Sequence, residues 1–209
     1  MQTSPRITVE VPVLRVGSGP SDYEELGSHV DALRRQQGLH LTLLHIGVLA
    51  DFAQDITDWT KGTTTTGEAV STAVAWLEGL PVLEGFSATT ERLVLLGGGR
   101  VSGLAVDVPH HVRDFQVSLV KALHELLDGL LVDNVDDFIL SSRALGFRYP
   151  RWTPHIAVGR PKTRGRGPWE IEPLAVEFGE SRIRNRQFLP VASADKDSGT
   201  TDPSQVEGK

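Results

Sequence analysis

Two short segments of this chain share one pattern, a histidine followed by an apolar, a small and a second apolar residue. They are His40-Leu41-Thr42-Leu43 and His155-Ile156-Ala157-Val158. Such alternation is typical of a β-strand, in which successive side chains point to opposite faces. His40 and Thr42 are therefore expected on one face of their strand, and His155 and Ala157 on one face of theirs. Side by side, the two strands would present two imidazoles to one ligand, as general acid–base catalysis requires.

The composition is that of a globular protein with many turns. Of the 209 residues, 39% are hydrophobic, and 21 are glycine and 12 proline. This length allows one large domain or two small lobes around a real core. The absence of cysteine excludes disulfides, thiolate nucleophiles and cysteine metal sites. Because the apolar runs are short and the N-terminus has no signal-like core, we expect a cytoplasmic protein that does not contact a membrane.

The charge distribution is uneven. A net charge of −6 argues against nonspecific coating of nucleic acid. Between Asp137 and Glu170, however, there is no acidic residue, and the basic residues there are Arg143, Arg148, Arg151, Arg160, Lys162, Arg164 and Arg166. This segment surrounds the second histidine and favours a substrate that carries phosphate, although a solvated basic loop would have the same composition. Arg160 follows the second motif strand directly, so it either binds phosphate or faces solvent.

The pattern predicts alternating helices and strands along most of the chain. Ser21 and Glu24 form a capping-box pattern, which predicts a helix that begins at Ser21 and ends at Gly38. Strands are expected at 7–14, 39–47, 86–96, 101–108, 154–160 and within 174–183, and helices at 49–59, 65–77 with Thr65 as N-cap, and 112–126. Residues 130–142 fit neither pattern. Residues 191–209 are polar and rich in small residues, which predicts a disordered tail.

With both motifs on predicted strands, the chain resembles the 2H phosphoesterase superfamily, in its bacterial 2′-5′ RNA ligase-like or RNA 2′,3′-cyclic phosphodiesterase branch. That family has two motifs of the form His-x-Thr/Ser-x, and His40-Leu41-Thr42-Leu43 matches the first fully. Thr153-Pro154 matches the approach to the second motif, and Gly47 stands where the family often has glycine. The resemblance implies an α+β, two-lobed fold over residues 1–190. Each lobe would be a mainly antiparallel sheet with helices outside, and one histidine strand from each lobe would line a central cleft.

The resemblance also implies a mechanism and a substrate class. His40 and His155 would be the catalytic acid and base, in an order that the sequence does not decide. Thr42 and Arg160 would bind the phosphate, and neither a metal nor another cofactor would be needed. The expected substrates are 2′,3′-cyclic phosphates, or related 2′-5′ phosphodiesters, on RNA ends or small nucleotides. We expect a monomer.

Two residues depart from the family pattern and leave alternatives open. Ala157 occupies the place of the second Thr or Ser, and His45 stands where related sequences more often carry an aromatic or aliphatic residue. Both departures favour a binding module that retains a phosphate pocket without useful catalysis. His45 has the opposite strand parity to His40, so we expect it to pack or to face solvent. For the same reason a zinc site of His40, His45 and His155 is disfavoured, and no helical His-Glu-x-x-His pattern occurs.

Overall fold

The expected combination of helices and antiparallel strands is confirmed. The computed structural model describes residues 6–145, 152–163 and 167–189, and the tail expected at 191–209 lies outside them. The strands are β1 (Arg6–Val16), β2 (Val30–Asp31), β3 (His40–Val48), β4 (Phe86–Leu96), β5 (Val101–Asp107), β6 (His155–Pro161), β7 (Trp169–Phe178) and β8 (Arg182–Arg184). The α-helices are α1 (Pro20–Glu24), α2 (Leu49–Trp59), α3 (Thr66–Glu78), α4 (His110–Gly129) and α5 (Val135–Ser141). Short 3₁₀ turns cover Glu25–Ser28, Gln36–Gly38 and Arg186–Phe188.

All strands in the described residues pair antiparallel and belong to one hydrogen-bonded network. The pairing order is β2-β6-β3-β1-β7-β4-β5, and β6 also pairs with β5, so six of the strands form a closed ring. The two halves of the chain therefore share one sheet. The short strand β8 pairs with β1 on the edge opposite β3.

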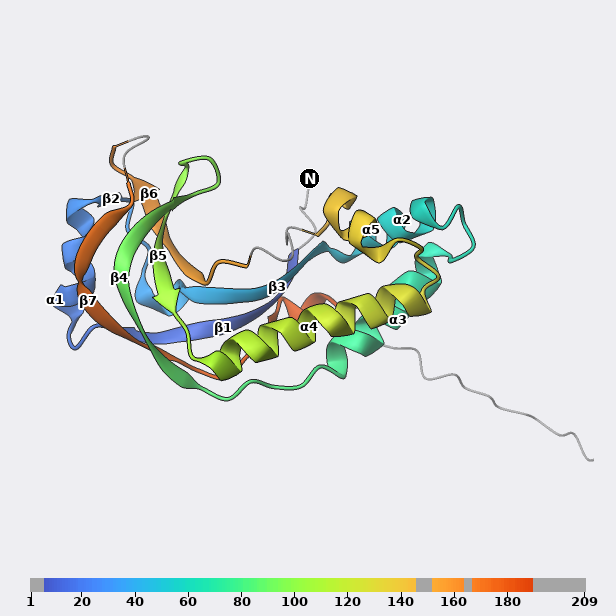
Figure 1. The fold of residues 1–209 in the computed structure, drawn as a ribbon, viewed down its shortest axis with the longest axis horizontal. Coiled ribbons are helices and arrows are strands. Elements are labelled where there is room, and N and C mark those ends of the chain that lie inside the picture. Colours follow the sequence, from blue (N-terminus) through green and yellow to red (C-terminus); the bar gives the residue numbers. More distant parts are fainter. Residues whose placement is uncertain (1–5, 146–151, 164–166, 190–209) are drawn as a thin grey trace, which may run out of the picture.

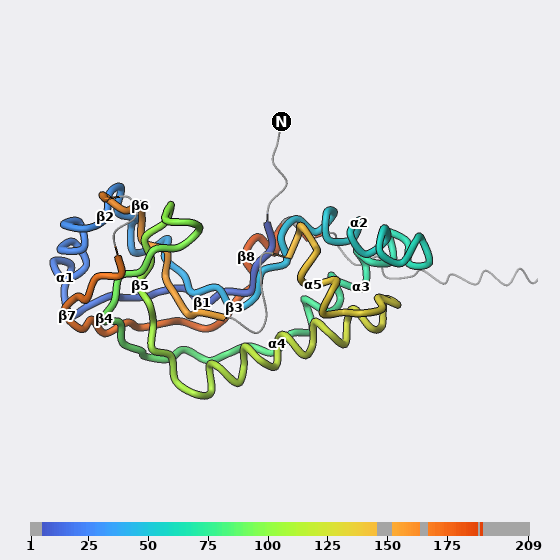
Figure 2. The backbone as a smooth tube through the Cα atoms, turned by 45° about the horizontal axis from the view of Figure 1, so that its top comes forward, coloured from blue at the N-terminus to red at the C-terminus, as the bar shows by residue number. Residues whose placement is uncertain are grey.

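The molecule is elongated, with strands gathered at one end and helices at the other. In Figures 1 and 2, β1 and β3 run from the strand-rich end, where α1 and β2 lie, to the end formed by α2, α3 and α5. The long helix α4 extends alongside β1 and β3 in both views. The first histidine strand is therefore shared between the sheet and the helical part of the core.

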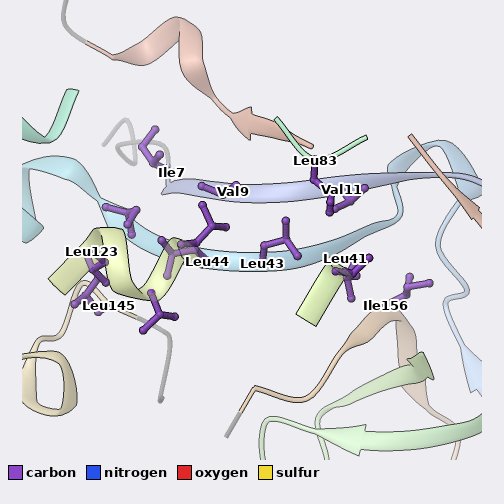
Figure 3. Close-up of a cluster of buried hydrophobic side chains, with 14 of the residues drawn as sticks. Ile7, Val9, Val11, Leu41, Leu43, Leu44, Leu83, Leu123, Leu145 and Ile156 are labelled. Atoms are coloured by element: carbon purple, nitrogen blue, oxygen red, sulfur yellow. The ribbon is translucent and has the colours of Figure 1, made fainter. Parts of the chain in front are cut away.

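One face of the sheet is apolar and forms the core. Register pairs carry one row of side chains across five neighbouring strands, and each residue of the row is 0% exposed: Val11, Leu41, Ile156, Leu104 and Leu93. Towards the helical end, Leu44 of β3 gathers with Leu123 of α4 and with Leu145 (Figure 3). Burial of each such leucine contributes roughly 1.5–3 kcal/mol. This apolar face therefore determines which side chains of the two histidine strands point into the core and which point away from it.

The helix predicted to begin at Ser21 and end at Gly38 is wrong. The helix α1 ends at Glu24, and Val30 instead pairs with Pro161 as part of β2. The N-cap is Gly19 rather than Ser21, because Pro20 occupies the first helical position and Asp22 accepts hydrogen bonds from the N–H groups of Ser18 and Gly19. The long-range pairing of β2 with β6 prevails over the local helical spacing, since it buries Val30 to 2% exposure.

The other expected elements are present. The glycines 97–99 form the turn of the β4–β5 hairpin, and all three have positive φ. The hydroxyl of Thr65 accepts a hydrogen bond from the N–H of Glu68, so Thr65 is the N-cap of α3. Residues 130–142, which fitted neither the helix nor the strand pattern, contain α5. No helix in the described part of the chain is long and apolar enough to cross a bilayer.

Gly47 is required by the end of β3. Its φ is +80°, a left-handed value that favours glycine, and a Cβ there would collide with the carbonyl oxygen of Ala144. The segment that contains Ala144 is held by the Asp55 carboxylate, which accepts from Ser142 Oγ and from the N–H groups of Arg143 and Ala144. This glycine therefore lets the chain after α5 pack directly on β3.

Gly47→Ala and Gly62→Ala form a matched pair that separates this collision from backbone strain. Gly62 has φ +81° but open space around it. We expect Gly62→Ala to lower the free energy of unfolding by about 1–2 kcal/mol, and Gly47→Ala to lower it by about 1–3 kcal/mol more. Urea unfolding of both variants measures the difference, and equal losses would contradict the close approach to Ala144.

Candidate active site

Both histidines stand at the first residue of their strands and are held in the same way. The Nδ1 atom of His40 lies 3.3 Å from the carbonyl oxygen of Gly38, and Nδ1 of His155 lies 2.7 Å from that of Thr153. Since a carbonyl oxygen only accepts, each Nδ1 carries a proton, which leaves each Nε2 for other partners. In each motif the residue two positions earlier therefore fixes the tautomer.

The register of the sheet places the two histidines on one face. Leu41 of β3 pairs with Ile156 of β6, and both point into the apolar core. In an antiparallel pair, the flanking residues then face the other way, with His40 opposite Ala157 and Thr42 opposite His155. His40 and His155 are thus diagonal neighbours, a relation that corresponds to about 7–8 Å between residues. The sequence-based expectation that adjacent strands would carry both imidazoles agrees with this arrangement.

We call this side of the sheet the polar face. Besides the two histidines it carries Thr8, Glu10 and Pro12 of β1, Thr42 and His45 of β3, Ala157 of β6, and Arg182 and Arg184 of β8. Thr42 is also tied to the second motif through its backbone, because Trp152 Nε1 donates to the Thr42 carbonyl oxygen at 3.1 Å. The chain that leads into His155 is therefore fastened to the first motif strand.

The expectation that His45 points away from His40 is wrong. The β1–β3 register shifts between Val9 and Glu10, where Val9 faces Leu44 and Glu10 faces Thr42, so Leu43 is an extra residue. This β-bulge reverses the alternation, and His45 lies opposite Thr8 on the polar face. Its Nδ1 accepts the N–H of Gly47 at 3.0 Å, and burial lowers its pKa, with Arg6 adding to the effect.

A buried carboxylate that sequence reasoning missed lies beside His40. Glu10 is 0% exposed, and its Oε1 accepts from Arg182 Nε at 3.2 Å and Nη2 at 3.0 Å. Its Oε2 lies 3.5 Å from Arg184 Nη1 and 3.6 Å from His40 Nε2. The available sequence signals were an acid between the core residues Val9 and Val11, and the alternation of arginines at 182 and 184, on either side of Ile183.

The surroundings of His40 favour its neutral form. Burial lowers the pKa of this imidazole and is the largest effect, while the Glu10 carboxylate and the Gly38 carbonyl act in the opposite direction. The positive charges of Arg184 and Arg34 lower the pKa further. The lowered pKa favours the unprotonated imidazole, and in that form Nε2 can accept an N–H of Arg184, whose Nη1 lies at 3.3 Å.

The remaining predicted site residues lie in different places. Arg160 is exposed and pairs with Asp31 of β2. The β5–β6 register shifts between Ala157 and Gly159, so alternation from His155 does not determine which face Arg160 occupies, and its role in phosphate binding stays a prediction. Ala157 lies opposite Gly103, which leaves this part of the polar face without side-chain donors. Of the basic segment, Arg148, Arg151, Arg164 and Arg166 lie outside the described residues.

A cavity adjoins the second motif strand. Its volume is about 340 Å³, and its lining includes Pro154, Ala105, Arg92, Asp107 and Arg113. Ala105 pairs with His155 on one side and Arg92 on the other, so the cavity begins one strand away from His155. It offers room for a substrate that extends from the histidines. Among the described residues, no group of three or more His, Asp or Glu side chains is placed to hold a metal ion.

Comparisons with known proteins give likenesses in fold. No protein-family model and no curated protein matches the chain. TT0787 of Thermus thermophilus is 15% identical, with a TM-score of 0.44 over 86% of this chain and 84% of that one. A structure named a phosphoesterase is 16% identical, with a TM-score of 0.42 over 85% and 93%. E. coli LigT in complex with 3′-AMP is 16% identical, with a TM-score of 0.43 over 85% and 92%. Likenesses at this level do not assign an activity to this chain.

The lowered pKa values of His40 and His45 predict how stability depends on pH. Both folded-state pKa values lie below the ordinary value of about 6.5. Between the folded value and 6.5 the unfolded chain binds more protons, so the free energy of unfolding should fall as the pH falls through 6.5.

Urea unfolding at pH 7.5 and pH 5.5 measures this loss of stability. His40→Asn and His45→Asn should each reduce it, whereas the exposed control His110→Asn should not. An unchanged pH dependence in both variants would contradict the lowered pKa values of His40 and His45.

Proposed function

We propose that this chain is a 2H-type phosphoesterase that opens 2′,3′-cyclic phosphates, or related 2′-5′ phosphodiesters, at RNA ends or on nucleotides. The observation that carries the proposal is the pairing of Leu41 with Ile156, because it sets His40 and His155 diagonally on one face. The two motifs match the family pattern in sequence, and both rings have Nδ1 held by a backbone carbonyl. Two imidazoles whose Nε2 atoms are not bound to the backbone are the groups needed to move one proton to, and one proton from, a phosphate centre.

His40 suits the role of the base. Its neutral form is favoured by burial and by Arg184, and its Nε2 has the lone pair that accepts a proton. Water attacks phosphorus as His40 Nε2 takes its proton. The bond between phosphorus and one ribose oxygen breaks, and His155 Nε2 gives a proton to that oxygen. The product is a nucleoside monophosphate, and one further proton exchange with solvent resets both imidazoles.

Thr42 is the proposed hydroxyl donor to the phosphate. It lies between the two histidines, opposite His155 and two residues from His40 on the same face. A hydroxyl that donates to an anionic oxygen contributes about 1.5–3 kcal/mol, which corresponds to roughly ten- to a hundredfold in rate. Ala157 provides no such donor, so the second motif contributes its histidine alone.

A binding module is the second candidate, and two observations favour it. Ala157 lacks the hydroxyl, and Arg184 occupies the Nε2 atom that the base requires. This function would take the same nucleotide phosphates and release them unchanged. It predicts saturable binding without product.

The test is hydrolysis of adenosine 2′,3′-cyclic phosphate in excess EDTA. We expect turnover by the unaltered chain, a loss of at least about a hundredfold in His40→Ala and in His155→Ala, and a loss of ten- to a hundredfold in Thr42→Ala. His110→Ala, which removes an exposed histidine from the first turn of α4, is the matched control and should keep full activity.

Two outcomes would count against this assignment. Full activity in either site variant would remove that histidine from the mechanism. No turnover by the unaltered chain on cyclic and 2′-5′-linked substrates, together with calorimetric binding of a nucleotide, would establish the binding module instead. Thermal unfolding of each variant verifies that the fold is intact.

A further inference from the structure

Arg184 reaches from β8 across β1 to the first catalytic candidate. Its backbone pairs with Thr8, yet its Nη1 lies 3.3 Å from Nε2 and from Nδ1 of His40. Because Nδ1 carries the proton that faces Gly38, Nε2 is the atom that accepts from the guanidinium. Arg184 therefore places a positive charge directly on the atom on which the proposed reaction depends.

The two arginines of β8 are held differently. Arg182 makes two contacts of 3.0 and 3.2 Å to one oxygen of Glu10, which is the geometry of a charge-assisted hydrogen bond. Arg184 is 3.5 Å from the other oxygen, at the limit of a hydrogen bond, and its side chain is 48% exposed. Both side chains are about half exposed, so the two arginines differ in their contacts: Arg182 is the hydrogen-bonded partner of the carboxylate, whereas Arg184 is held at longer distances.

The charges around Glu10 do not balance. One carboxylate faces two guanidinium groups, and His40 beside them is neutral, so one positive charge remains on the polar face. Arg34 adds to the positive potential at His40. An anion at this point would restore neutrality, and a guanidinium presents two N–H groups in the geometry that phosphate oxygens accept.

The uncompensated positive charge lies close to Ala157, the position at which the second motif lacks a hydroxyl donor. His40 is directly opposite Ala157 in the β3–β6 register, and Arg184 contacts the ring of His40. An N–H of Arg184 can therefore reach a phosphate that lies over His40 and Ala157. Arginine is longer than threonine, so it can supply from β8 a donor that the family pattern takes from β6.

We propose that Arg184 binds the phosphate together with Thr42 and replaces the hydroxyl absent at Ala157. When a phosphodiester binds, the N–H of Arg184 moves from His40 Nε2 to a phosphate oxygen, and the lone pair of Nε2 becomes free to accept a proton. The substrate thereby activates its own base. This inference deepens the proposed function, on which it rests, by naming the group that recognises the phosphate.

The test combines binding and turnover in a double-mutant cycle of Arg184→Ala and Ala157→Thr. Calorimetric titration with adenosine 2′-monophosphate measures phosphate binding without requiring catalysis. Arg184→Ala should weaken binding, and lower kcat/KM on the cyclic phosphate, by about ten- to a hundredfold. Ala157→Thr alone should change either quantity by less than about threefold, but in the Arg184→Ala background it should recover at least part of the loss. The control is Arg15→Ala, which removes a half-exposed arginine near the other end of β1 that forms an ion pair with Glu177 of β7.

A purely structural role for Arg184 would give a different result. It would lower the melting temperature, and Ala157→Thr would not restore phosphate binding. A third readout is the pKa of His40 followed by NMR, which should rise in Arg184→Ala because a neighbouring positive charge is removed. Unchanged binding of adenosine 2′-monophosphate in Arg184→Ala would overturn the proposal. Weakened binding in that variant, with no turnover even by the unaltered chain, would support the proposal while refuting the proposed hydrolase.

Discussion

The short contact between β3 and β6 is the constraint on which the rest of the site depends. Leu41 and Ile156 form the register pair that joins the two histidine strands, and both are fully buried in a row that continues onto β1, β5 and β4. Because strand side chains alternate, burial of these two residues turns His40 and His155 to the opposite face together. A slip of one residue in either strand would bury one histidine and expose a core leucine or isoleucine. Packing energy thus holds the two histidines in the arrangement on which the proposed function depends.

The electrostatics of the polar face follow from a single buried carboxylate. Glu10 is completely buried, and such a charge is tolerated only with partners. Arg182 meets this need, while Arg184 Nη1 and His40 Nε2 lie farther from the second oxygen, at 3.5 and 3.6 Å. The result is a neutral imidazole beside a positive charge that is not fully compensated. Such a site offers a positive charge that could bind a phosphate and a neutral ring nitrogen that could accept a proton.

The sequence predicted the parts of this site that depend on local patterns and missed those that depend on distant pairings. Alternation alone located β3, β6 and the two histidines. The β-bulge at Leu43 could not be read from alternation, and it moved His45 to the polar face. The helix expected up to Gly38 gave way to the pairing of Val30 with β6. Glu10 and Arg184 were missed because they meet only when β8, at the far end of the chain, pairs with β1.

A crystal structure with bound adenosine 2′-monophosphate would test the central claim most directly, because it measures both histidines against one ligand. The account predicts that the Nε2 atoms of His40 and His155 both lie within hydrogen-bond distance of oxygens of the same phosphate group, including the ester oxygen that joins it to the ribose. Binding of the nucleotide elsewhere, or contact of its phosphate with only one of the two imidazoles, would contradict a two-histidine site on the polar face.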